Sequence, residues 1–391
     1  MAAGGAACTD YSGCRAMMRE RGGEADRMRG ATIVPDSRML SDSDPLFWSG
    51  AALGVAFGAV IQWSRLCIVA ALSNAVVVRD YRHAAGWIAA IAVTIAGTAW
   101  LEASGTVAVA ESGYRSATLD WLGADLGGLV FGIGAMLAGG CASRTVVDAG
   151  EGNGAAMIAL ACFALAAYAT LFGPLEPLRA ALVHRTQIEL AAGDASVAAL
   201  AGVPQAYAAG VAALACAGIA LWLARGQRAG QLLAGGVVVG TLVVTGWWIT
   251  GHAVVDEFSP ARPDSLSFSG PLARIALFAI EHKSSGSVFG IGVVAGTLAG
   301  SLVTAAARRT LALRRPPREQ VVRSIIGGAL MGIGGVLAGG CNVGHALTGI
   351  GTLSVKSVMA TGAILVGMGL VLAWMERARD VPALPQRGTA R

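Results

Sequence analysis

Two cysteines end the copies of a duplicated, glycine-rich segment in this chain of 391 residues. The fifteen residues that end at Cys141 return 200 positions later and end at Cys341, with ten of the fifteen identical. Gly140 and Gly340, each the second glycine of a Gly-Gly pair, directly precede these cysteines. Glycine pairs interrupt a helix, so each cysteine is predicted to begin a new one, where unpaired N–H groups and the helix dipole attract anions. The pattern therefore predicts a ligand of negative charge.

The segments that must position these cysteines are poor continuous helices. Gly128 and Gly132 in the first copy, like Gly328 and Gly332 in the second, place small residues on one helix face and allow close approach of a neighbouring backbone. A helix that breaks at membrane depth is tolerated only where protein or a polar cavity satisfies the loosened backbone groups. Duplicated broken segments in a hydrophobic chain are typical of membrane transporters built from inverted repeats, with the site at the breaks.

Composition places the chain in a bilayer. Its mean hydropathy is +0.62, and 55% of its residues are hydrophobic while only 14% are charged, against about 25% charged residues in soluble domains. A crossing of the bilayer needs roughly 20 apolar residues. We therefore expect an all-α polytopic membrane protein with an inverted internal repeat, about nine transmembrane helices and several short re-entrant or broken helices around a central pinched pathway. Uncharged runs cover residues 46–64, 84–101, 154–175, 195–224, 229–250, 284–307 and 357–375.

The same patterns divide the chain. Residues 1–45 are polar and lack the apolar stretch of a signal peptide, so a disordered tail is expected there. Residues 46–175 are predicted to form the first transmembrane repeat and residues 271–376 the second. Residues 176–270 would connect the repeats within the membrane, and residues 377–391 would form a cytoplasmic tail.

Charge indicates the orientation of the loops. The formal net charge is +5, and residues 308–323 hold six arginines against a single glutamate. Residues 102–125 hold four acids and only Arg115. By the positive-inside rule the first of these loops is cytoplasmic and the second external. Basic residues beside a membrane need no further partner, so the chain is not expected to bind nucleic acid.

Three motifs resemble the YeeE/YedE family of sulfur-compound transporters. They are Gln62-x-Ser-Arg-x-Cys67, the Gly-Gly-Cys141 motif with Gly-Glu-Gly-Asn153 after it, and Gly-Gly-Cys341-Asn-Val-Gly with the stretch that ends at Ser354. The resemblance implies an hourglass-shaped bundle in the inner membrane that takes up thiosulfate or a related sulfur anion. It also implies that Cys67, Cys141 and Cys341 contact the anion in turn, and that a small cytosolic sulfur-carrier or sulfurtransferase protein receives the product.

Thiol chemistry suits such a path. An uncompensated charge in hydrocarbon costs tens of kcal/mol by Born estimates, so helix N-termini and donors must replace the anion's hydration. A neutral thiol is a weak donor suited to terminal sulfur, whereas a thiolate would repel the dianion, so burial is expected to keep the thiols protonated. Weak contacts also allow the ligand to leave. A transporter rather than an enzyme, with no cofactor, is the expectation.

Several alternatives stay open at this stage. Another sulfur or selenium species could be the cargo, or the chain could be a membrane sulfurtransferase that forms a cysteine persulfide on a reactive thiolate. All three cysteines could simply pack as small hydrophobes, as is expected of Cys162 and Cys216. Cysteine and histidine spacing excludes a metal site. A disulfide between Cys141 and Cys341 could form if the repeats meet at an axis.

Polar residues beside the cysteines complete the candidate site. Arg65 and Arg144 lie near the first-half cysteines, and charges at membrane depth are functional candidates. Arg65 could instead extend to the interface, and Arg144 could pair with Asp148 four residues later. Asn342 could donate to an oxyanion or cap a helix. His345 is interpreted as a turn histidine rather than a proton carrier. Gly140 and Gly340 would form the kinked backbone beside the ligand.

Overall fold

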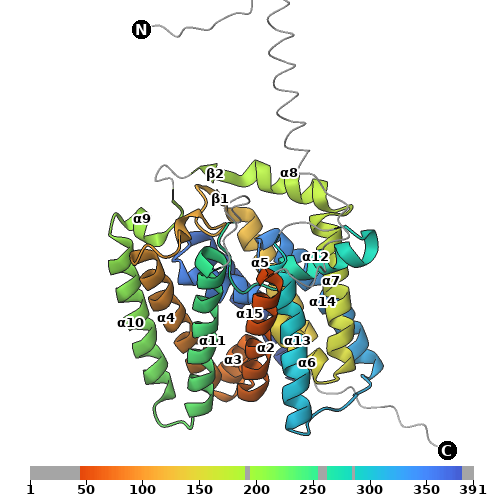
Figure 1. The fold of residues 1–391 in the computed structure, drawn as a ribbon. Coiled ribbons are helices and arrows are strands. Elements are labelled where there is room, and N and C mark those ends of the chain that lie inside the picture. Colours follow the sequence, from red (N-terminus) through yellow and green to blue (C-terminus); the bar gives the residue numbers. More distant parts are fainter. Residues whose placement is uncertain (1–44, 190–193, 254–261, 284–286, 381–391) are drawn as a thin grey trace, which may run out of the picture.

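The computed structural model describes residues 45–189, 194–253, 262–283 and 287–380. The expected N-terminal tail, with its Cys8 and Cys14, lies outside the described residues. Within them the chain is an α-helical bundle with one small two-stranded sheet (Figure 1).

Nine described segments are long and apolar enough to cross a membrane, as the sequence predicted. Two of them are broken: Pro45–Val78 is interrupted after Ser64, and Trp121–Gly150 is interrupted after Ala138. The long helices are α2 (Pro45–Ser64), α4 (Arg82–Ala103), α5 (Trp121–Ala138), α7 (Gly154–Leu171), α10 (Gln205–Ala224), α11 (Gly230–Trp248), α13 (Phe289–Ala307), α14 (Arg318–Ala338) and α15 (Val355–Asp380).

Shorter elements connect the long helices. The α-helices among them are α3 (Ile68–Ser73), α6 (Ala142–Gly150), α8 (Glu176–Thr186), α9 (Val197–Ala201) and α12 (Ser269–Glu281). π-helical turns cover Asn74–Val78, Ile249–Ala253 and Gly344–Gly349, and a 3-10 turn covers Val109–Glu111. Strands β1 (Thr118–Asp120) and β2 (Gln187–Glu189) pair antiparallel.

One expected span begins later than its uncharged run. The run from residue 195 to 224 divides into α9 and α10, because Gly202 takes a left-handed conformation with φ of 66° and Pro204 directly precedes α10. Proline lacks an N–H and restricts the residue before it, so the helix cannot continue through this point.

The two copies of the glycine-rich segment pack against each other in opposite directions. Gly127, near the start of α5, abuts the backbone of Ala338 at the end of α14, and Gly327 abuts the backbone of Ala138 in the same way. The contact between α5 and α14 is therefore the same when the two copies are exchanged. Such a contact requires a twofold axis that is perpendicular to both helices. The predicted inverted repeat is confirmed.

Each copy also packs against the last span of the other half. On α5, Gly128 meets the carbonyl of Ala360 in α15, while on α14 Gly328 meets the carbonyl of Ala159 in α7. One helical turn further, Gly132 and Gly332 repeat these contacts with Ile364 and Phe163. The predicted role of these glycines in close packing is confirmed, because a Cβ at any of them would collide with a facing backbone.

A second pair of mirrored contacts involves α11. Gly54 and Gly58 of α2 face Val293 and Thr297 of α13, while Gly236 and Gly240 of α11 face Gly86 and Ala90 of α4. The pair α2–α13 thus corresponds to the pair α11–α4. We propose that the second repeat begins with α11, inside the region that the sequence assigned to a connection between the repeats.

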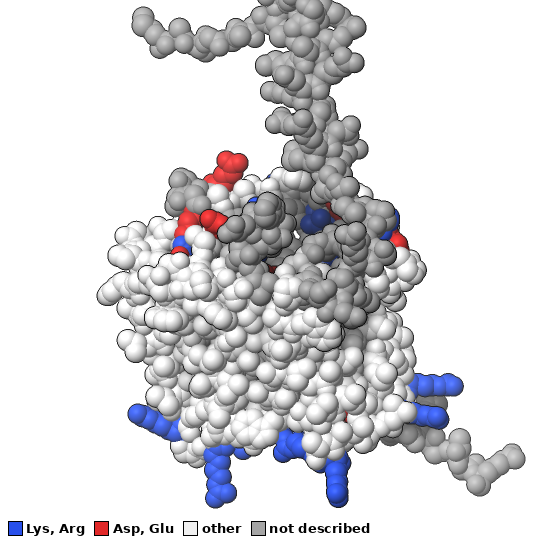
Figure 2. Space-filling view, viewed as in Figure 1, with Lys and Arg blue, Asp and Glu red and all other residues white. Residues whose placement is uncertain are grey.

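Charged side chains gather at the two ends of the bundle and leave a broad uncharged band between them (Figure 2). In the view shown, Lys and Arg stand along the lower end and acidic residues at the upper end. The upper end carries β1, β2 and α8 (Figure 1). There Arg115 forms ion pairs with Glu102 and with Asp194. We name the arginine-rich end the basic end and the other the acidic end.

Candidate functional site

The two glycine kinks have the same backbone geometry. Gly139 and Gly339 are left-handed, with φ of 81° and 84°, and end α5 and α14. The N–H of Gly140 reaches back to the carbonyl of Ala135 at 3.1 Å, and the N–H of Gly340 reaches that of Gly335 at 2.8 Å. This pattern of bonds satisfies the last carbonyls of each helix and turns the chain sharply.

Each candidate cysteine directly precedes a short helix and is buried. Cys67 precedes α3 and Cys141 precedes α6, while Cys341 precedes the helical stretch that continues through Gly344–Gly349. Their exposed fractions are 6%, 1% and 0%. The expected helix starts are therefore present at all three thiols.

The thiols lie beside the unpaired N–H groups of these helix starts. Neither Cys67 nor Cys141 makes a full capping hydrogen bond. Each thiol nevertheless lies near the N–H three residues later, at Ala70 and Arg144. Cys341 has the same relation to Gly344. The N–H groups of each first turn thus lie beside the sulfur atom and make no full capping hydrogen bond with it.

The three thiols and one amide form a single buried cluster. The Cys67 and Cys141 side chains lie within hydrogen-bonding reach of each other, and Asn342 lies beside Cys141. Cys341 also lies close to Cys141. Asn342 is fully buried, and neither its Nδ2 nor its Oδ1 makes a hydrogen bond of normal geometry. All three cysteines are free, so the alternative of a Cys141–Cys341 disulfide is wrong for this structure.

Phe268 has the place in the second half that Cys67 has in the first. Each directly precedes a short helix, α12 or α3, and each lies beside the repeat cysteine of its own half. Phe268 contributes its backbone N–H to Cys341 and packs its ring 5.6 Å from that of Phe57. The cluster is therefore asymmetric, with three thiols and one aromatic ring.

A cavity of about 210 Å³ lies on the first-half side of the thiols. Arg65 and Arg144 line it, three residues or fewer from Cys67 and Cys141. Arg65 forms two hydrogen bonds with Glu151, of 2.9 and 2.6 Å, rather than only extending to the interface. Arg144 forms an ion pair with Asp148 at 2.6 Å, which is the pairing that the sequence offered as an alternative for this arginine. Arg314, from the arginine-rich loop of residues 308–323, also lines this space, and we call it the inner cavity.

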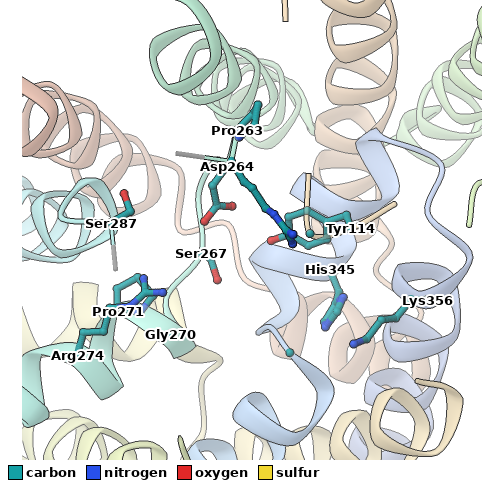
Figure 3. A pocket seen from close by; sticks show the side chains of 13 residues that line it. Tyr114, Pro263, Asp264, Ser267, Gly270, Pro271, Arg274, Ser287, His345 and Lys356 are labelled. Carbon is teal, nitrogen blue, oxygen red and sulfur yellow. The ribbon is translucent and has the colours of Figure 1, made fainter. Parts of the chain in front are cut away.

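A larger cavity of about 470 Å³ lies on the second-half side, next to Cys341 (Figure 3). Gly339 and His345 line it, along with Lys356 and Tyr114. His345 is buried, and its Nδ1 lies 3.2 Å from Ser357 Oγ. We call this space the outer cavity. Close sequence neighbours of Cys67 and Cys141 thus line the inner cavity, and close sequence neighbours of Cys341 line the outer cavity.

Charges in the outer cavity favour anions. Its lining includes the cations Lys356, Arg262 and Arg274 and the acid Asp264. Burial raises the pKa of Asp264 to about 6, although the Ser265 N–H and the nearby Arg274 oppose this shift. The carboxyl is therefore about half ionised near pH 6 and carries its full negative charge only at clearly higher pH. The lining groups were not predicted, because they come from segments far apart in the sequence.

The described residues contain no group of three or more His, Cys, Asp or Glu side chains that could hold a metal ion. Cys162 and Cys216 are half-buried on α7 and α10, and Cys216 packs against a separate group of buried residues that includes Ile95 and Ala209.

Comparison with known proteins gives consistent matches. A family model described as sulphur transport matches residues 63–370. The thiosulfate transporter TsuA of Spirochaeta thermophila is 28% identical over 347 residues, which cover 84% of this chain and 99% of that protein. The thiosulfate transporter TsuA of Escherichia coli is 26% identical over 323 residues, which cover 76% of this chain and 86% of that protein.

Proposed function

The chain belongs to the sulphur transport family, and from this premise we propose that it takes up thiosulfate, or a closely related sulfur anion, across the inner membrane. Two relatives named as thiosulfate transporters align along most of its length. The observation that carries the proposal is the cluster of three buried thiols, whose close sequence neighbours line two cavities that both contain cations.

The cluster supplies what a divalent anion needs when it leaves water. Three helix starts and the N–H of Phe268 direct donors toward the thiols. Asn342 adds an amide whose polar atoms have no other hydrogen bond of normal geometry. Such donors replace hydration without a full countercharge, which would bind the anion too tightly for release.

We propose that the anion passes from the outer cavity to Cys341, then to Cys141 and Cys67, and leaves by the inner cavity. The terminal sulfur of thiosulfate would accept weak S–H hydrogen bonds at each step. In the inner cavity, Arg144 and Arg65 are already paired with Asp148 and Glu151. Paired arginines attract an anion less strongly than free ones, which favours release toward the cytoplasm.

A membrane sulfurtransferase is the competing function. It requires a reactive thiolate in a cationic and water-accessible place. Cys141 and Cys341 are at most 1% exposed, which favours passage of an intact anion over covalent chemistry. Persulfide formation would appear in a mass spectrum of the protein after incubation with thiosulfate. Transport with no such adduct is the expected result.

Thiosulfate uptake by liposomes that contain only the purified protein tests the proposal. Competition by other sulfur and selenium anions would define the cargo. Addition of a small cytosolic sulfur-carrier or sulfurtransferase protein inside the liposomes would test the proposed receiving partner, which should prolong uptake by removing the product.

A further inference from the structure

The outer cavity contains a cation and two hydroxyl groups close to the kink that precedes Cys341. We propose that Lys356, Tyr114 and Ser267 form an oxyanion-binding site that holds the ligand by its oxygen atoms before its sulfur reaches Cys341. The order of these two events rests on the proposed function. The binding site itself can be tested without transport.

Lys356 is the central residue of this site. Its Nζ lies 3.3 Å from the position that a Cβ would take on Gly339, two residues before Cys341. Its ion pair with Asp120 is long, at 3.5 Å. Asp120 already accepts a hydrogen bond from the N–H of Gly123 at the start of α5. An ammonium group carries three donors, so Lys356 keeps donors for a ligand.

Tyr114 and Ser267 line the same cavity from other segments of the chain, and their hydroxyl groups lie within hydrogen-bonding reach of each other. Ser267 Oγ lies 3.1 Å, and the Tyr114 hydroxyl 3.4 Å, from the position of a Cβ on Gly344. Gly344 belongs to the first turn after Cys341, and its N–H lies near the Cys341 thiol. The two hydroxyls and the ammonium thus line one cavity, whose lining also includes Gly339 of the kink before Cys341 (Figure 3).

These donors are suited to the oxygens of a tetrahedral divalent anion. Ammonium and hydroxyl groups bind oxyanions by charge and hydrogen bonding and do not require a sulfur atom. Sulfate and thiosulfate differ by one terminal atom, so both fit such a site. Only thiosulfate offers the soft atom that the thiols would contact. Sulfate should therefore bind at the outer site and block it without passing further.

The two glycine kinks differ at this point, which provides a matched comparison. A Cβ on Gly339 would meet Lys356 Nζ, whereas a Cβ on Gly139 would meet nothing within 4 Å. Both glycines have positive φ, so alanine causes the same kind of backbone strain at either position. Gly339→Ala should weaken sulfate binding more than Gly139→Ala does.

Equilibrium binding of radiolabelled sulfate to the full-length protein in lipid nanodiscs tests the site. Lys356→Met should weaken binding by about tenfold to a hundredfold, the range for a lost hydrogen bond to a charged group. Lys356→Arg should retain most of the affinity. Lys283→Met is the matched control, because Lys283 lies at the same end of the bundle but pairs with Glu281 outside the cavity. It should bind sulfate as the wild type does.

Asp120→Asn separates a direct role of Lys356 from a structural one. An asparagine can still accept from the Gly123 N–H, but it no longer competes for the ammonium. Sulfate binding by this variant should equal or exceed that of the wild type. Loss of binding in Asp120→Asn, wild-type binding in Lys356→Met, or absence of sulfate binding in the wild type would each overturn the site. Lysine-dependent sulfate binding without any thiosulfate uptake would instead overturn the proposed function and leave the site standing.

Discussion

Alanine at the repeat cysteines should impair transport while leaving the fold intact. Cys141 and Cys341 are buried at helix starts, where backbone N–H groups approach both thiols, and Cys141 Sγ also lies 3.4 Å from Ser143 Oγ. Removal of one buried heavy atom costs on the order of 1 kcal/mol of folding stability, which a large membrane bundle tolerates. A lost contact with the charged ligand costs about 1.5–3 kcal/mol.

If that loss falls on the highest barrier of the path, uptake should decrease roughly tenfold to a hundredfold in each single variant. The assay is the initial rate of radiolabelled thiosulfate uptake by liposomes with equal amounts of folded protein, as judged by size-exclusion chromatography and thermal unfolding. Cys162→Ala and Cys216→Ala are matched controls, because these cysteines are only half-buried on α7 and α10. Near-normal uptake by both repeat variants, or strong defects in both controls, would refute the assignment of the thiols.

Four further predictions follow from particular contacts. Gly58→Ala should destabilise the fold by about 1–3 kcal/mol, because its Cβ would collide with the Thr297 carbonyl, whereas Gly218→Ala, with open space around it, should unfold at the wild-type temperature. Acidification from about pH 7.5 to about pH 5 should strengthen thiosulfate binding, because burial raises the pKa of Asp264 to about 6 and its protonation removes a negative charge from the outer cavity. Asp264→Asn should lose this pH dependence. If Asp264→Asn binds thiosulfate with the pH dependence of the wild type, the pH dependence belongs to another group. Burial alone would raise the pKa of Asp194, but its ion pair with Arg115 outweighs burial and lowers the pKa. This carboxylate therefore stabilises the fold above its unfolded-state pKa, and the stabilisation is lost as pH falls through its folded-state pKa. Asp194→Asn should reduce the acid sensitivity of thermal unfolding, and a variant as acid-sensitive as the wild type would show that the ion pair does not contribute to stability. Deletion of residues 1–38, which leaves Met39 as the start, should preserve insertion and transport because this polar segment has no apolar stretch, and an inserted but inactive truncation would give the segment a functional role.

The sequence predicted those parts of the fold that repeat in residue type. Glycines four residues apart require close backbone contact, so Gly128 and Gly328 indicated the packing that the structure contains. The Gly-Gly pairs predicted both kinks, because only glycine adopts the left-handed conformation of Gly139 and Gly339 without strain. The proposed correspondence of α11 with α2 rests on which helix each one contacts and not on a repeated motif, so the sequence offered no signal for it.

The candidate site could be predicted only in part for the same reason. The repeat cysteines share a motif, but Phe268 corresponds to Cys67 in position and not in chemistry, so no sequence signal joined them. Lys356, Tyr114 and Ser267 line the outer cavity from three separate segments. Their convergence results from tertiary packing, which local spacing does not encode. The available signal was Lys356 itself, the single charged residue between Arg323 and Glu376.

The most direct test of the account is the initial rate of thiosulfate uptake by protein-only liposomes, compared with sulfate uptake by the same liposomes. The account predicts saturable thiosulfate uptake above that of empty liposomes, inhibition by sulfate, and no uptake of sulfate itself. Equal uptake of both anions would contradict selection by the thiols. Thiosulfate uptake no faster than in empty liposomes, with folded protein present, would contradict the transport function.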